Sequence, residues 1–188
     1  GGNDLIQEIT QAELGYKFMN DSVQFFATAF ANEVEGDTFV RRPGAPAEIL
    51  TNEAYGVELD GRYSHDSGFS LSVNATLQET EITASATNEG NEAQRQPGWQ
   101  VRVTPSYDFD IGDMYATVYG TLSAVDDRFG NNENTVVLEG YEKIDVGMTL
   151  DPTESLRLQL SVDNLTDEQG ITEGDPRNPD APNGRFIM

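Results

Sequence analysis

Cysteine is absent from the 188 residues, and His65 is the only histidine. The chain therefore has no disulfide, no zinc–thiolate site and no thiol nucleophile. Basic residues are also scarce, because 11 Lys and Arg stand against 33 Asp and Glu, for a net charge of -22. A chain this acidic has little with which to neutralise phosphates, which argues against nucleic acid as a partner.

Long apolar runs are also missing. No stretch of about 18 apolar residues occurs, so the sequence predicts no transmembrane helix. The opening GGNDLIQEIT lacks the basic and apolar regions of a signal peptide, and we expect none here. The mean hydropathy of -0.51 is typical of a soluble protein. It does not exclude a membrane β-barrel, in which only every second strand residue faces lipid.

Apolar and polar residues alternate along several segments. The clearest are AYGVELDGRYS (54–64), FSLSVNATLQ (69–78), WQVRVTPSY (99–107) and SLRLQLSVD (155–163). A strict period of two predicts strands with one apolar and one polar face. We expect eight strands, at residues 10–19, 23–34, 54–64, 69–82, 99–109, 114–125, 141–151 and 155–164.

The connections between these strands alternate in length. Short turns at 20–22, 65–68, 110–113 and 151–154 alternate with long polar loops at 35–53, 83–98, 126–140 and 165–188. This order predicts an all-β, antiparallel up-and-down meander with every short turn at one end. Outer-membrane barrels of Gram-negative bacteria separate short turns from long loops in this way, and their strands have this length. The alternative is a soluble β-sheet whose aromatic residues pack in a core.

Aromatic residues gather near the predicted strand ends. Such rings favour the two membrane interfaces, so we expect belts on either side of an aliphatic band, in contact with membrane lipid and lipopolysaccharide. The expected belt residues are Tyr16, Phe18, Tyr55, Tyr63, Phe69, Trp99, Tyr107, Phe109 and Tyr141. Charged residues of the opposite face, among them Glu58, Arg102 and Asp145, are expected to point into a polar lumen.

Four motifs resemble, in order, the C-terminal part of TonB-dependent outer-membrane receptors. They are QAELGYKF (11–18), AYGVELDGRY (54–63), PGWQVRVTPSYDF (97–109) and VDNLTDEQGITEGDPR (162–177). The resemblance implies that residues 1–188 are the last third or so of a 22-stranded β-barrel. It also implies that the plug domain and the closing strand lie outside these residues.

The resemblance implies a transport function rather than an enzyme. Receptors of this family bind a scarce, bulky nutrient, such as siderophore-iron, a cobalamin-like molecule or an oligosaccharide. Their partners are the plug domain and a TonB-type protein that couples energy from the inner membrane. A passive porin-like or adhesin-type barrel is the alternative. His65 stands beside Asp66 and Ser67 in one short turn, where three neighbouring residues cannot converge as a catalytic triad.

The predicted loops contain two kinds of candidate binding residue. Basic and aromatic residues that stand close together can bind an anionic or aromatic ligand, but salt bridges to neighbouring acids are the commoner role of such residues. These candidates are Phe39, Arg41, Arg42, Arg95, Trp99, Arg128 and Phe129. Asp126, Asp127 and Glu133 offer oxygen ligands suited to Ca²⁺, but their spacing is not that of an EF-hand. Beyond that option we expect no cofactor.

Overall fold

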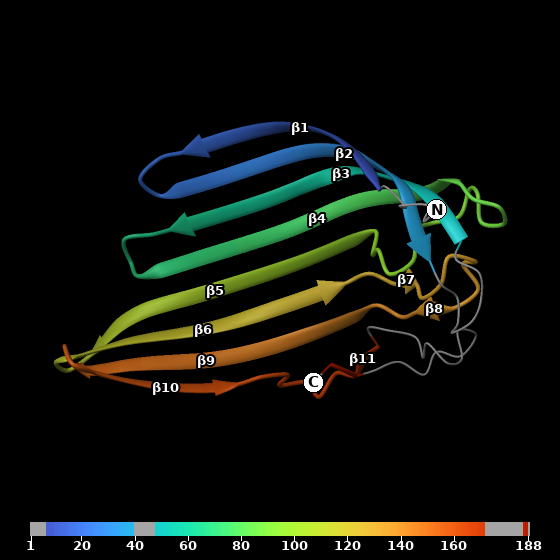
Figure 1. Cartoon of the computed structure of the whole chain (residues 1–188). Helices are drawn as coiled ribbons and strands as arrows, with labels where there is room; N and C mark the ends of the chain where they lie inside the picture. Colours follow the sequence, from blue (N-terminus) through green and yellow to red (C-terminus); the bar gives the residue numbers. More distant parts are fainter. Residues whose placement is uncertain (1–6, 40–47, 172–185, 188) are drawn as a thin grey trace.

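The structure is a computed structural model that describes residues 7–39, 48–171 and 186–187 (Figure 1). No helix within these residues is long and apolar enough to cross a bilayer. The strands are β1 (Glu8–Met19), β2 (Val23–Phe39), β3 (Glu48–Ser64), β4 (Phe69–Ala84), β5 (Trp99–Ile111), β6 (Met114–Val125), β7 (Arg128–Phe129), β8 (Val137–Leu138), β9 (Tyr141–Thr153), β10 (Leu156–Val162), β11 (Gly170–Ile171) and β12 (Phe186–Ile187).

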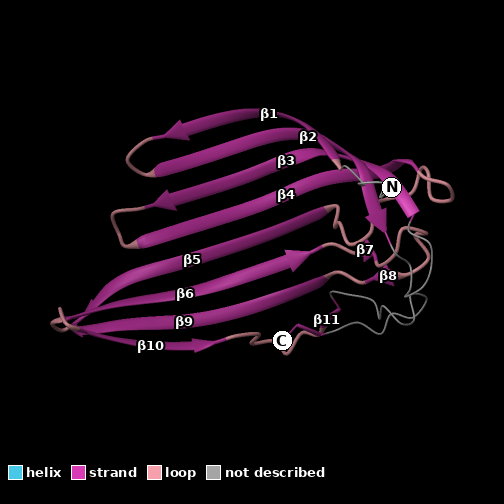
Figure 2. Ribbon diagram, viewed as in Figure 1, coloured by secondary structure: helices cyan, strands magenta, loops and turns pink. Residues whose placement is uncertain are grey.

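Eight of these strands form one antiparallel sheet in the order β1-β2-β3-β4-β5-β6-β9-β10. Each long strand pairs with the next one along the chain, and β1 and β10 lie at opposite edges of the curved sheet (Figure 2). Strands β7 and β8 form a small hairpin between β6 and β9, and β11 pairs with β12. The predicted all-β, up-and-down barrel fragment is confirmed, and its described part is an open sheet.

The two faces of the sheet follow from the pairing register. Gly61, Val73, Val103, Leu122 and Ile144 are direct partners in one row across β3 to β9. The neighbouring row belongs to the other face and reads Lys17, Phe26, Asp60, Asn74, Arg102, Ser123 and Lys143. One face is thus apolar and the other mostly polar, as the period of two requires.

Among the residues that the structure describes, no second layer of protein packs against the apolar face. Few large apolar side chains are buried in the described residues, whereas Leu14 is 77% exposed and Leu160 is 70% exposed. A sheet that packed a soluble core would bury such residues. Exposure along a whole face is the arrangement of a barrel wall that is surrounded by lipid.

The predicted long loop at 35–53 is wrong. Strand β2 continues to Phe39 and β3 begins at Glu48, so the pairing of these two strands extends well beyond the predicted ends. A bulge between Glu35 and Asp37 accommodates one extra residue, Gly36, whose φ is 75°.

The extension of β2 and β3 was not predicted because acidic residues interrupt the alternation of apolar and polar residues there. Glu33, Glu53 and Glu81 are direct partners on the face that is apolar further along the strands. Strands that continue beyond a bilayer no longer need an apolar face, so the alternation stops before the pairing does.

Candidate functional site at the loop end

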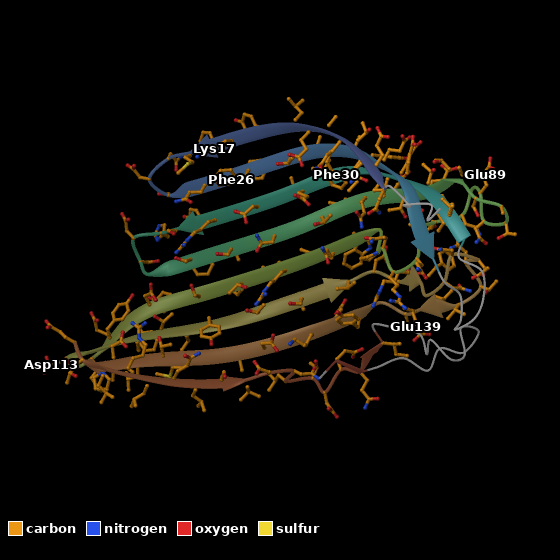
Figure 3. The ribbon with its side chains drawn as sticks, in the orientation of Figure 1. Lys17, Phe26, Phe30, Glu89, Asp113 and Glu139 are labelled. Carbon is orange, nitrogen blue, oxygen red and sulfur yellow. The ribbon has the colours of Figure 1, made fainter. Side chains whose placement is uncertain are left out.

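The long connections lie together at one end of the sheet, which we name the loop end. Glu89 and Glu139 lie there, whereas Asp113 lies at the opposite turn end (Figure 3). The turn end is built from tight connections such as 65–68, in which the His65 Nδ1 atom lies 2.8 Å from the Ser67 Oγ atom. The predicted separation of short turns from long loops is therefore present in the structure.

Loops 85–98 and 126–140 are joined directly by hydrogen bonds. The backbone N–H groups of Glu92 and Gln94 donate to the side-chain oxygens of Asn134 (2.8 Å) and Asn132 (3.2 Å). The backbone N–H of Arg95 donates to the Phe129 carbonyl at 2.6 Å. In return the Asn134 amide donates to the Glu92 carbonyl at 3.0 Å. Two connections that are about 40 residues apart in sequence thus share one hydrogen-bond network.

Asn131 shapes the turn of the β7–β8 hairpin. Its side-chain oxygen accepts hydrogen bonds from the backbone N–H groups of Thr135 and Val136, both at 3.1 Å. Only 3% of Asn131 is exposed, so these bonds form away from water. Asn134 follows with φ of 52°, a left-handed conformation that asparagine adopts more readily than most residues.

Arg128 connects this hairpin to the next segment of the chain. It is only 7% exposed, and its guanidinium donates to the Ile171 carbonyl (2.9 Å) and to the Asp126 carbonyl (3.5 Å). The guanidinium carbon also lies 6.0 Å from the centre of the Tyr141 ring. That ring packs against Gly170, where an added Cβ would come within 2.8 Å of it. Within the described residues, Arg128 is thus held by carbonyl groups and an aromatic ring rather than by an acidic side chain.

The start of the VDNLTDEQG segment is an ordered turn. The Asn164 N–H donates to the Asp145 carboxylate at 2.7 Å, and the Leu165 N–H donates to the Ile144 carbonyl at 2.7 Å. The Asn164 side chain accepts from the Glu168 N–H (3.0 Å) and donates to the Glu168 carbonyl (2.9 Å). Asn164 therefore ends β10 and ties the following residues to β9.

Two hollows lie near these elements. One of about 420 Å³ lies between loops 85–98 and 126–140, with Gln96 and Phe129 in its lining. The other, of about 500 Å³, lies on the polar face, where Glu58 and Arg102 line it from β3 and β5. The Asn74 amide nearby donates to the Asp60 carboxylate. These hollows give the loop end and the polar face room for polar groups of a ligand or partner.

The predicted ligand-contacting residues are scattered over the loop end. Phe39 is the last residue of β2, and Arg41 and Arg42 lie outside the described residues. Arg95 is exposed, whereas Arg128 is buried.

Two aromatic residues belong to the same set of candidates. Phe129 pairs with Val137 in the hairpin. Trp99 opens β5 opposite Leu77, on the apolar face, and is 40% exposed. The structure does not group Arg95 with Trp99, or Arg128 with Phe129, as ring-contact pairs, and ligand contact by these residues stays a prediction.

Eight of the nine predicted belt aromatics share the apolar face by register, namely Tyr16, Phe18, Tyr55, Tyr63, Phe69, Trp99, Tyr107 and Phe109. Tyr141 differs from the prediction. It pairs with Val125, itself a partner of Gln100, and so belongs to the polar face. Its position at the start of a strand favoured an aromatic belt at the membrane interface, but its ring packs against Gly170.

The candidate calcium ligands do not form a cluster. Across residues 7–39, 48–171 and 186–187, no three acidic or histidine side chains lie close enough together to hold a metal ion. Asp126 and Asp127 line the hollow between the loops, and Glu133 is not among its lining residues. Burial raises the pKa of the Asp126 carboxyl above its ordinary value. Calcium binding by Asp126, Asp127 and Glu133 therefore stays a prediction.

The sequence reading missed the asparagines that build the loop end. Hydrogen bonds of three of them join loop 85–98 to loop 126–140, namely Asn91, Asn132 and Asn134. The fourth, Asn164, is bonded to Asp145 of β9. The available signal was the run GNNEN at 130–134, because Gly and Asn favour turns with left-handed residues. That signal predicts a turn, but it does not say which distant loop the amides contact.

Comparisons with known proteins agree with this fold. The family profile described as TonB dependent receptor-like, beta-barrel matches residues 1–165. No curated protein sequence matches the chain. The ferric yersiniabactin uptake receptor FyuA from Yersinia pestis is similar in structure, with a TM-score of 0.80 and 19% identity over 90% of this chain and 26% of that receptor.

Two further solved structures are similar. BauA, the ferric preacinetobactin receptor from Acinetobacter baumannii, has a TM-score of 0.76 and 22% identity over 88% of this chain and 26% of its own. The copper transporter OprC has a TM-score of 0.73 and 16% identity over 91% of this chain and 27% of its own. The chain thus spans about a quarter of the length of these proteins. With the profile match covering most of its residues, the chain belongs to the TonB dependent receptor-like β-barrel family.

Proposed function

We propose that the chain is the C-terminal portion of an outer-membrane active-transport receptor of a Gram-negative bacterium. The receptor binds a scarce, bulky nutrient at the loop end and imports it with energy supplied from the inner membrane. The observation that carries this proposal is the family match over residues 1–165, together with a sheet that has one apolar face and all its long loops at one end.

The polar face supports an occupied lumen. Arg102 and Glu58 line the hollow of about 500 Å³ on this face, and Lys17 lies over the Phe26 ring at 5.1 Å. Charged groups of both signs on one face suit a polar filling better than hydrocarbon. We propose a plug domain of the same protein as the filling, and a TonB-type protein as the partner that acts on it.

The ligand class stays open among three proposals: siderophore-iron, a cobalamin-like molecule and an oligosaccharide. Phe39, Arg41, Arg42, Arg95, Trp99, Arg128 and Phe129 remain the residues that we propose for ligand contact. We also propose that the protein has no enzymatic activity, since transport requires binding and release without a chemical step.

Deletion of the gene tests the transport function. The deletion strain should lose growth on one scarce nutrient from a panel of ferric siderophores, cobalamin and oligosaccharides, each supplied as the sole source. Restoring the gene should restore growth, but only in cells with a functional TonB-type protein. Growth that returns equally without that protein would favour the passive porin-like alternative. Unchanged growth on the whole panel, with loss of surface attachment, would favour an adhesin.

A further inference from the structure

We infer that residues 85–98, 126–140 and 163–171 form one preassembled body, here named the three-loop unit. The first two segments connect different strand pairs of the sheet and the third follows β10, so nothing in their order along the chain requires them to act together. The contacts of the described residues join the first to the second and the second to the third. The three segments separate from one another only together, whichever ligand the receptor carries.

The first joint lies between loops 85–98 and 126–140. Hydrogen bonds cross this joint in both directions: Asn134 accepts from the Glu92 N–H and donates to the Glu92 carbonyl, and the Asn91 amide donates to the Asn132 carbonyl at 2.8 Å. Asn132, which accepts from the Asn91 amide and the Gln94 N–H, is only 3% exposed. The two bonds between Asn134 and Glu92, in contrast, lie at the surface. Polar groups buried to this degree are costly to leave unpaired, so separating the loops breaks several bonds at once.

The second joint lies between the hairpin and residues 163–171. Arg128 extends from β7 to the Ile171 carbonyl, and the Tyr141 ring covers Gly170. Asn164 fastens the other end of the same segment to Asp145 on β9. The segment is therefore held at both ends, and one of its anchors belongs to the same hairpin that holds loop 85–98.

The two joints make the three-loop unit more rigid as a surface for ligand binding. A separate surface loop opens locally at almost no cost, whereas segments that share several hydrogen bonds open together. A preformed wall also loses less conformational entropy on binding than a loop that must be ordered. The three-loop unit accordingly stays in place when ligand binds, and contacts the ligand as a fixed surface.

Hydrogen exchange followed by mass spectrometry tests the first joint in the full-length receptor in detergent. Asn134→Gly removes the amide but tolerates the left-handed backbone, and we expect amides of loop 85–98 to exchange about tenfold faster in this variant. Trypsin should then cleave after Arg95, which the intact unit resists. Glu139→Ala is the matched control, because Glu139 is exposed in the same loop. Faster exchange confined to 126–140, with loop 85–98 unchanged, would show two independent loops and overturn the inference.

Asn91→Ala provides the reciprocal test from the other loop, and decides the question if Asn134→Gly does not fold. It removes the bond to the Asn132 carbonyl, so exchange should rise in loop 126–140, about 40 residues away in sequence. Unchanged exchange there would contradict a shared unit. Because both tests are made without ligand, they stand or fall separately from the transport function.

Discussion

The barrel wall and the loop end of this molecule are stabilised in different ways. In the wall, formed by β1–β6, β9 and β10, backbone pairing runs from strand to strand and side chains need only alternate between an apolar and a polar face. At the loop end, individual amides such as those of Asn132 and Asn134 join segments that are far apart in sequence. The wall therefore depends on a pattern, whereas the loop end depends on particular residues.

This difference sets what substitutions should do in each region. Within the wall the face that a residue occupies should outweigh its identity. At the loop end the identity of a single amide or guanidinium should matter more than its polarity. We expect the largest effect from a charge placed on the apolar face of the wall, and the smallest from the loss of one amide in a loop.

Val73→Arg should have the largest effect. Val73 belongs to the apolar row and lies midway between Phe69 and Leu77 on β4, and a charged side chain facing the bilayer midplane costs about 2–4 kcal/mol. Thr76→Arg is the control on the same strand, because Thr76 faces the polar side opposite Glu58. The free energy of unfolding of the receptor from lipid vesicles should fall only for Val73→Arg. Equal losses would mean that the two faces are not lipid and lumen.

Gly147→Ala should destabilise the wall by about 1–3 kcal/mol through overpacking. Gly147 pairs with Tyr119, and an added Cβ would overlap the Tyr119 ring. At Gly120 the nearest atom to an added Cβ is 3.8 Å away, so Gly120→Ala should be tolerated. Denaturant unfolding of both variants compares them. A tolerated Gly147→Ala would show that the ring is free to move aside.

Arg128→Met should loosen the loop end by about 1.5–3 kcal/mol, the usual value of hydrogen bonds that involve a charged group. Methionine keeps much of the apolar volume but cannot donate to the Ile171 and Asp126 carbonyls. Hydrogen exchange in residues 163–171 should rise, while exchange in β4 and β5 should not change. In Arg128→Lys, exchange in residues 163–171 should lie between that of the unsubstituted receptor and that of Arg128→Met. One ammonium group can donate hydrogen bonds but cannot reproduce the planar fork of donors of a guanidinium.

Asn164→Gly should have the smallest effect, about 1 kcal/mol. Glycine tolerates the φ of 53°, so the variant loses the side-chain bonds to Glu168 without backbone strain. Asn164→Asp keeps the acceptor for the Glu168 N–H and loses only the donor, so its effect should be smaller still. Exchange of the amides of residues 164–168 distinguishes the two variants; identical exchange would mean that the bond accepted from the Glu168 N–H contributes little.

Sequence patterns predicted the wall closely. The expected segments 99–109, 114–125 and 141–151 correspond to β5, β6 and β9, and five of the strand starts agree to the residue. This success has a physical cause: a sheet between lipid and a polar lumen must alternate along its full width. The prediction failed at 35–53, where Glu33 and Glu53 lie beyond the apolar band and the pairing continues without alternation.

The loop end could not be derived in the same way. GNNEN at 130–134 predicts a turn, yet the partners of Asn132 and Asn134 lie in loop 85–98, and no local rule names them. Arg128 was expected beside Phe129 because the two are adjacent in sequence, but its ring contact is with Tyr141. Contacts between loops depend on how the strands beneath them are placed, and that placement is a property of the whole sheet.

The orientation of the wall is most directly tested by cysteine labelling in intact cells. The chain has no cysteine of its own, so single substitutions at Glu89, Glu139 and Asp113 provide unique sites within it. A membrane-impermeant maleimide should label Glu89→Cys and Glu139→Cys from outside, and should reach Asp113→Cys only after the cells are permeabilised. Labelling of Asp113→Cys in intact cells, with Glu89→Cys and Glu139→Cys protected, would contradict the assignment of the loop end to the cell exterior.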